Sequence, residues 1–412
     1  MQDARTGEVV RKVLAHEKSQ LVVLNGDLVT GATTQADNVT AYVDQVLQPV
    51  IDSGLPWATT YGNHDHQSYS KPEELFKHEQ RYKKSLTQNM LPNNSNAGVS
   101  NYYLLVYPAS GNQTVPDLIL WFFDSRGGNF HDGSKRPDWV DESVGIKTLP
   151  FMFRPNILTL TSQVVTWFVE ANKKLTQEYK KVIPSLAFYH IPISATFKFQ
   201  KDPGVNPSTE PGINGEQVVW QGEMYDKKLD HDLEFMEALS NTSGLLATFS
   251  GHDHDNDWYV VSGFNTSRKK TGLLTDIPLP RCYKWKPKDP GHDVNICYGR
   301  HTGYGGYGDL DRGGRQILLK KPTLDKEAIT WIRLEDGRVP ENVTLNSTYG
   351  HDQYHPIHHS PDLAQVSLEL KARDFEGAGN SLQAAPGLSL AFNLSLNLYA
   401  ALFLFVLGFI AR

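Results

Sequence analysis

The tetrapeptide Gly62-Asn63-His64-Asp65 directly follows the apolar run Trp57–Tyr61. Carboxamide, imidazole and carboxylate groups therefore lie together at the end of a predicted strand. In α/β proteins such strand ends carry ligand and metal sites, because the backbone leaves the sheet there and presents its side chains. A polar loop of turn-forming residues would give the same string, so its meaning depends on the rest of the chain.

Apolar periodicity predicts an alternation of helices and strands. Helical spacing is typical of five segments, Thr6–Lys18, Thr40–Ser53, Glu73–Thr87, Leu160–Lys174 and Leu229–Leu239. Short apolar runs predict nine further strands, Leu21–Leu24, Tyr102–Tyr107, Leu118–Asp124, Ser185–Tyr189, Leu245–Ser250, Trp258–Gly263, Asn295–Tyr298, Gln316–Lys320 and Ile329–Glu335. This alternation indicates a layered α/β protein.

Four of these strands are followed by side chains of the types that can bind metal ions. Asp27 follows the first strand, Asn63 and His64 the second, His190 another, and His252 with His254 the strand Leu245–Ser250. A structural explanation would need four unrelated polar loops to coincide with strand ends. Carboxylate, carboxamide and imidazole donors without thiolate suit iron, zinc or manganese better than a structural zinc site.

His252 and His254 are separated by one residue. In extended backbone their imidazoles project to the same side, so each can reach an ion. The pair can therefore serve two neighbouring metals.

These motifs resemble a known family. Gly26-Asp27, Gly62-Asn63-His64-Asp65, His190 and Gly251-His252-Asp253-His254 resemble, in order and spacing, the calcineurin-like metallophosphoesterase superfamily. Residues 1–335 look similar to its small purple-acid-phosphatase-like group of fungi and plants. The resemblance implies a four-layer α/β/β/α sandwich of two mixed sheets, with the metals at the strand ends.

The resemblance also assigns roles to individual residues. It implies five metal ligands: Asp27, Asn63, His190, His252 and His254. Asp27 would bridge two ions (Fe, Zn or Mn), and His254 would bind the ion that the other three do not. A hydroxide made available by these ions would attack phosphorus, with His64 as the general acid held by Asp65.

Two departures from the family pattern concern the second metal. The family's first motif, an Asp-x-His on a strand before the opening helix, is absent, so we expect that the sequence begins after this N-terminal strand. Thr30 stands where purple enzymes carry an iron-binding tyrosine, so we expect no tyrosinate colour. Near the site, Arg300 and His301 would either contact phosphate or belong to an ordinary glycine-rich loop.

Composition narrows the class of partner. A formal net charge of -6 provides no basic field for a nucleic-acid backbone, so we expect no nucleic-acid partner. The cysteines, Cys282 and Cys297, are too few for a disulfide scaffold or a cysteine zinc site. We expect them to form one disulfide.

Two features indicate the secretory pathway. N-glycosylation motifs begin at Asn38, Asn93, Asn112, Asn241, Asn265, Asn342, Asn346 and Asn393. After a phosphoesterase domain at 1–347 and a polar linker at 348–387, residues 388–412 form a hydrophobic tail preceded by small residues. This order predicts a GPI-anchor signal, with a transmembrane segment as the alternative.

These features predict an extracellular, cell-surface or vacuolar protein held at a membrane by its tail. The start, Met1 to Lys18, has no apolar signal peptide, which agrees with the expected missing start.

Two functions remain open from the sequence. The first is a dinuclear-metal phosphoric-ester hydrolase, with the choice among monoester, diester and phosphoprotein substrates undecided. The second is a catalytically inactive surface binding protein that keeps the fold. An Asp-x-His strand encoded upstream would favour the enzyme.

Overall fold

The computed structural model describes residues 2–30, 34, 36–67, 70–92, 97–109, 114–128, 162–219, 232–262, 294–357 and 404–410. Its helices are α1 Gln2–His16, α2 Val39–Ser53, α3 Pro72–Glu79, α4 Ser162–Tyr179, α5 Ser194–Lys201 and α7 Leu233–Asn241. One sheet contains β1 Leu21–Asn25, β2 Trp57–Thr60, β9 Gly313–Lys320, β10 Ala328–Leu334, β11 Asn342–Leu345 and β12 Leu404–Ile410. The other contains β3 Tyr102–Val106, β4 Leu118–Phe122, β5 Ser185–Phe188, β6 Leu245–Ser250, β7 Tyr259–Ser262 and β8 Val294–Tyr298.

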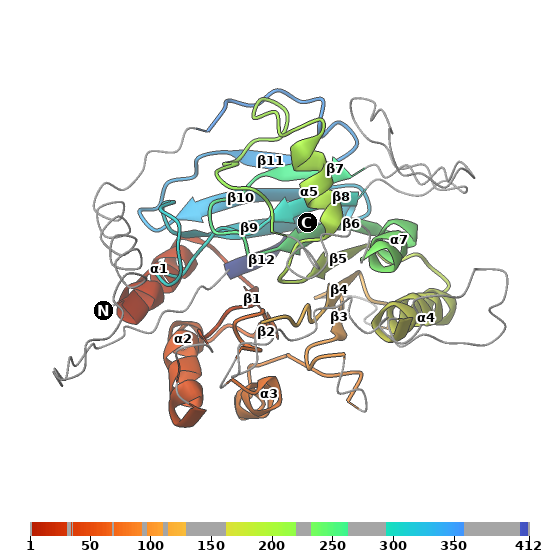
Figure 1. The fold of residues 1–412 in the computed structure, drawn as a ribbon. Coiled ribbons are helices and arrows are strands. Elements are labelled where there is room, and N and C mark those ends of the chain that lie inside the picture. Colours follow the sequence, from red (N-terminus) through yellow and green to blue (C-terminus); the bar gives the residue numbers. More distant parts are fainter. Residues whose placement is uncertain are drawn as a thin grey trace, which may run out of the picture.

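Each sheet mixes parallel and antiparallel pairs. The first, sheet A, follows the order β11-β10-β9-β12-β1-β2, and the second, sheet B, follows β3-β4-β5-β6-β8-β7 (Figure 1). The predicted α/β fold with two mixed sheets is confirmed.

Side-chain alternation along the strands builds the layers. On β1, Leu21 and Val23 join one apolar cluster with residues of sheet B, whereas Val22 and Leu24 pack with α1 and α2. On sheet B, the outer-facing side chains of β4 pack against α4 and α7. Because successive side chains of a strand face opposite sides, each sheet buries one face against the other sheet and one against helices (Figure 1).

Parallel pairing brings the candidate residues to one edge. β1 pairs with β2 in parallel, and β4, β5, β6 and β8 are parallel neighbours. Strand ends of parallel neighbours lie at the same sheet edge, so the residues that follow β1, β2, β5 and β6 gather there.

The third helix is shorter than the periodicity predicts. Helical spacing indicated Glu73–Thr87, but α3 ends at Glu79. Residues 84–87 instead run beside β2, where Trp57 N donates to Lys84 O at 3.0 Å and Leu86 N donates to Trp57 O at 2.7 Å. Pairing with a strand competes with helix continuation here. Neither α5 nor β11 was predicted from the sequence.

The hydrophobic tail forms a strand within the described residues. β12 lies between β9, to which it is parallel, and β1, to which it is antiparallel. The expected anchor signal or transmembrane segment is tested neither by this pairing nor by the rest of the described chain. Among the described residues, none of the helices combines the length and apolarity needed to cross a membrane. Anchoring itself stays a prediction.

Some expectations concern residues outside the described ranges. They are most of the 348–387 linker, the start of the tail, and Cys282. Within the described residues, Cys297 is a free cysteine buried in β8, and its expected disulfide with Cys282 stays a prediction.

Candidate metal centre

The turns after β1 and β2 require glycine. Gly26 and Asp27 have positive φ angles of 90° and 56°. A Cβ atom at position 62 would lie 2.3 Å from Asp27 Oδ1, and one at position 26 would lie 2.5 Å from His190 Nδ1. The left-handed backbone at Asp27 is unfavourable for a residue other than glycine. It places the carboxylate in the buried space between the two turns.

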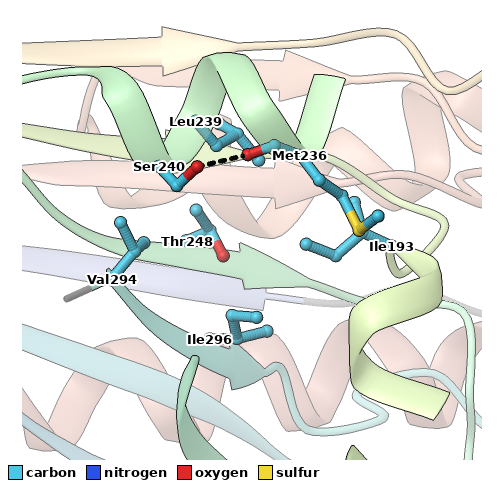
Figure 2. A pocket seen from close by; sticks show the side chains of 7 residues that line it. All are labelled: Ile193, Met236, Leu239, Ser240, Thr248, Val294 and Ile296. Atoms are coloured by element: carbon cyan, nitrogen blue, oxygen red, sulfur yellow. Dashed lines mark hydrogen bonds between the residues drawn. The ribbon is translucent and has the colours of Figure 1, made fainter. Parts of the chain in front are cut away.

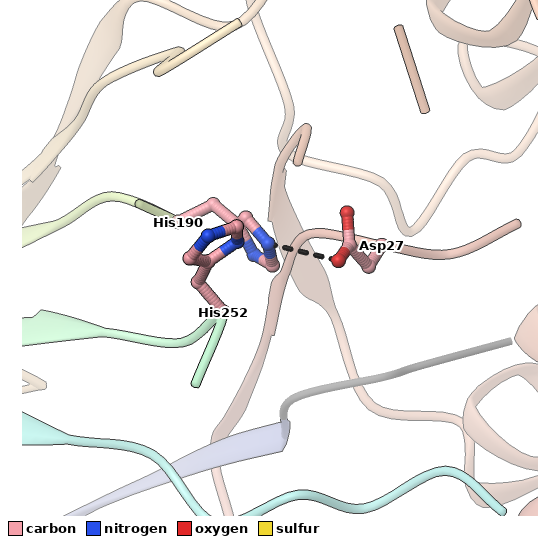
Figure 3. A group of neighbouring side chains, drawn as sticks. All are labelled: Asp27, His190 and His252. Atoms are coloured by element: carbon pink, nitrogen blue, oxygen red, sulfur yellow. Dashed lines mark ion pairs between the residues drawn. The ribbon is translucent and has the colours of Figure 1, made fainter. Parts of the chain in front are cut away.

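Asp27 and His190 form the buried centre of the site. His190 Nδ1 donates to Asn25 O at 2.7 Å, so it is Nε2 that faces Asp27 Oδ2, at 2.9 Å (Figure 3). Burial alone would raise the pKa of Asp27, but the charges of His190, His64 and His252 outweigh it and lower that pKa. Burial opposes charge on His190 too, yet Asp27 raises its pKa. A cation bound by both Asp27 Oδ2 and His190 Nε2 would accept a lone pair from each of them.

With Asp27 and His190, the side chains of His252 and Asn63 make a group of four potential metal ligands. His252 Nδ1 donates to Asn63 Oδ1 at 2.9 Å. Ligand atoms of Asp27, His190 and His252 all lie within 4.8 Å of one another, and Figure 3 shows these three side chains converging. Burial, with repulsion from His190, lowers the pKa of His252 to about 3. A neutral imidazole is the form that binds metals.

His254 lies apart from this group. It does not belong to the cluster of ligand atoms found among the described residues. Its Nδ1 donates to Tyr307 O at 2.8 Å, and burial lowers its pKa to about 3. Of the five predicted ligands, four come together, and the fifth, which follows β6 like His252, lies against Tyr307 of the glycine-rich loop 299–308.

His64 and Asp65, which we expected to pair, have different hydrogen-bond partners in this structure. His64 Nδ1 donates to Gln67 Oε1 at 2.6 Å, and its backbone N donates to Asp27 Oδ1 at 2.9 Å. Asp65 accepts instead from the backbone N–H groups of Gly62, at 2.8 Å, and Val29, at 3.1 Å. A buried carboxylate between two turns satisfies their amide groups, so Asp65 fixes the backbone of the site. Burial and the charge of Asp27 raise the pKa of Asp65 to about 7.

Several residues that support the site were not predicted from the sequence. Gln67 holds His64, and His66 Nε2 donates to the buried Asp124 Oδ1 at 2.9 Å. Five side-chain donors converge on buried Glu79: Trp57 Nε1, Thr59 Oγ1, Tyr61 OH, Ser85 Oγ and Thr87 Oγ1, at 2.7–2.9 Å. No signal in the sequence sets Glu79 apart, since Lys77 and Arg81 lie two residues away on either side, and only the fold shows its donors.

The guanidinium group of Arg300 is already bonded to other groups of the protein. It is buried, ion-paired with Asp257, and donates to Asp311 O at 2.7 Å. His301 is buried against His254, with ring centroids 3.9 Å apart. Between the two sequence alternatives, these contacts favour the structural loop over direct contact with phosphate.

A small cavity lies elsewhere, between α7 and the outer face of sheet B. Ile193, Met236, Thr248 and Ile296 are among its lining residues (Figure 2). Its volume of about 10 Å³ suits one water molecule, and no candidate ligand lines it.

The donor set fits a metal ion. One carboxylate, one carboxamide and two imidazoles converge without a thiolate, and the nearby His190 and Asp27 donors face each other at 2.9 Å. Such a set suits iron, zinc or manganese. Two packed sheets with these ligand groups at their strand ends define an α/β protein with a candidate metal centre.

Residues 1–256 match the model of the calcineurin-like phosphoesterase family. The chain belongs to that family, as the sequence predicted.

Its relatives include plant and yeast proteins. It is 26% identical over 358 residues to probable inactive purple acid phosphatase 14 of Arabidopsis thaliana, covering 81% of this chain and 73% of that protein. Probable inactive purple acid phosphatase 29 of the same plant is 23% identical over 354 residues, covering 81% and 75%. Phosphatase DCR2 of Saccharomyces cerevisiae is 26% identical over 275 residues, covering 62% and 39%. A crystal structure of a dimetal phosphatase from Danio rerio aligns with a TM-score of 0.43 and 12% identity, covering 82% of this chain and 88% of that one.

Proposed function

We propose that this protein is a metal-dependent phosphoric-ester hydrolase. The observation that carries the proposal is the convergence of Asp27, His190 and His252 within 4.8 Å, with Asn63 against His252. Family membership supports a phosphate-ester substrate.

Each residue of the candidate site has its own role in the proposed reaction. Asp27, Asn63, His190 and His252 would hold one ion, and Asp27 with His254 a second. Ions of this kind neutralise phosphate oxygens and make hydroxide available near neutral pH. His64, whose Nδ1 is bonded to Gln67, presents its Nε2 as the proton donor for the leaving alcohol. Asp65 keeps the turns in place through Gly62 and Val29.

The test uses the full chain supplied with Fe, Zn or Mn. Bound metal is measured by mass spectrometry, and hydrolysis of p-nitrophenyl phosphate and bis(p-nitrophenyl) phosphate is followed from pH 4 to 8. We expect metal binding and turnover, and loss of both in Asp27→Ala. Metal-loaded protein without turnover of either ester would overturn the enzyme proposal.

The second candidate is a binding protein without catalysis. Two Arabidopsis relatives carry the word inactive in their names, and His254 lies apart from the other donors. This candidate predicts that the metal-loaded chain binds inorganic phosphate in calorimetry, yet releases no product from either ester.

We also propose a glycosylated location in the secretory pathway, with membrane attachment through the tail. Support comes from the exposed side chains of the motif residues Asn38, Asn241 and Asn342. Expression in a eukaryotic cell should give a mass decrease on treatment with N-glycosidase. Unglycosylated protein in the cytosol would contradict this proposal.

A further inference from the structure

His254 is enclosed by two other rings. The Tyr307 ring stacks on its imidazole with a centroid distance of 4.1 Å and an interplanar angle of 14°. The His301 ring lies 3.9 Å from the same imidazole at 36°. Two rings this close cannot share one face, so His254 is sandwiched between them.

The loop that carries Tyr307 is fixed at several points. Arg312 donates through Nη2 to Gly308 O and through Nη1 to Leu310 O, both at 2.9 Å. The Tyr307 hydroxyl donates to Glu216 Oε2 at 2.9 Å. A Cβ at position 306 would lie 2.3 Å from His254 Cε1, so only glycine lets the loop approach this closely. The Tyr307 ring is therefore held in one orientation before any substrate binds.

Tyr307 is also open to solvent. It is 46% exposed, although His254 covers one face and Glu216 holds its hydroxyl. Almost half of the residue thus stays accessible to a further contact although one ring face is covered. An aromatic side chain held rigidly with a free face is a stacking surface for another flat group.

We propose that Tyr307 is an aromatic platform at the rim of the metal centre, which selects phosphate esters with a flat aromatic leaving group over saturated ones. The inference rests on the proposed function, because His254 is the ligand on which Tyr307 stacks. An ester held by a metal ion at His254 would lie on the side of the centre where the Tyr307 ring stands, because that ring stacks on His254. Aryl phosphates and nucleotides have leaving groups of this shape.

The experiment compares two probes of similar size, phenyl phosphate and cyclohexyl phosphate, by calorimetry on the metal-loaded full chain. We expect the wild type to bind phenyl phosphate about five-fold more tightly, as aromatic pairing allows. Tyr307→Leu should reduce the ratio to about one. Tyr307→Phe keeps the ring and loses only the Glu216 bond, so it should keep the ratio.

Metal content is measured for each variant, because a change at His254 weakens both probes alike and leaves their ratio unchanged. Absence of a preference in the wild type, absence of binding of either probe, or an unchanged ratio in Tyr307→Leu would overturn the inference. Binding with the phenyl preference but without hydrolysis of either probe would instead count against the enzyme proposal alone. Hydrolysis without the preference would count against the platform alone.

Discussion

Asn63 Oδ1 and His252 Nδ1 lie 2.9 Å apart, although 189 residues separate them in the sequence. Asn63 follows β2 of sheet A, and His252 follows β6 of sheet B. The candidate centre is therefore built at the junction of the two sheets. Its ligand set exists only when both sheets are packed together.

Asn63→Ala should weaken metal binding by about ten- to a hundred-fold, the range found when groups that orient metal ligands are removed. The change removes an oxygen donor and frees the His252 ring. Calorimetric titration with Zn²⁺ or Mn²⁺ measures the affinity. Asn172→Ala on α4 is the control, and an equal loss in both variants would contradict the assignment of Asn63.

His64→Gln should retain bound metal and reduce the hydrolysis of alkyl phosphates by about 10² to 10⁴, the usual contribution of a general acid. The loss should be much smaller for p-nitrophenyl phosphate, because p-nitrophenolate leaves without protonation. Steady-state kinetics on both substrates provides the measurement. Equal losses on the two esters would show that His64 does not donate a proton.

Asp124→Asn should lower the free energy of unfolding by about 3 kcal/mol at pH 6, the range for breaking a buried pair. Burial opposes the charged form of Asp124, but His66 and the amides of Val99 and Arg126 outweigh it and lower its pKa. A lowered pKa contributes stability above the unfolded value of about 4, and that stability is lost as the pH falls through the folded value.

The difference between wild type and Asp124→Asn should therefore shrink below about pH 4. Urea unfolding from pH 3 to 7 checks this, with exposed Asp325→Asn as the control. A difference independent of pH would mean that the carboxylate charge plays no part.

Glu79→Gln should lower the free energy of unfolding by about 2 to 4 kcal/mol, because the amide turns an NH₂ group toward side chains that donate to the carboxylate. Glu74→Gln on the same helix is the matched control, since that side chain is 62% exposed. Denaturant unfolding compares the two. A loss no greater than that of the control would show that the five donors do not depend on the carboxylate.

Cys297 should react with a thiol reagent only after unfolding. It is a free, buried cysteine, and burial raises its pKa to about 12, so its thiolate is scarce at pH 8. In Cys282→Ser, we expect no reactive thiol in the native protein and one in guanidinium. Wild type unfolded without reductant should show both thiols, whereas none would reveal the disulfide that the sequence suggested.

Much of the fold was predictable because its signals are local. An apolar run of strand length, ended by glycine and a polar residue, is visible at Leu21–Asp27, Trp57–Asn63 and Leu245–His252. The end of α3 was not predictable, because residues beyond Glu79 keep helical spacing while β2 supplies competing backbone partners. The tail shows the same limit, since an apolar segment suits a membrane or a sheet interior equally well.

The sequence by itself determined the two-sheet class, the family and the identity of the candidate donors, since each depends on residue type and local order. Only the tertiary structure decided which of these donors meet. It brought Asn63, His190 and His252 to Asp27, and placed His254 between Tyr307 and His301. In the folded chain His64 bonds to Gln67, whereas Asp65 accepts hydrogen bonds from the backbone N–H groups of Gly62 and Val29. Buried polar groups need such partners, and these two amides belong to turns that only folding brings together.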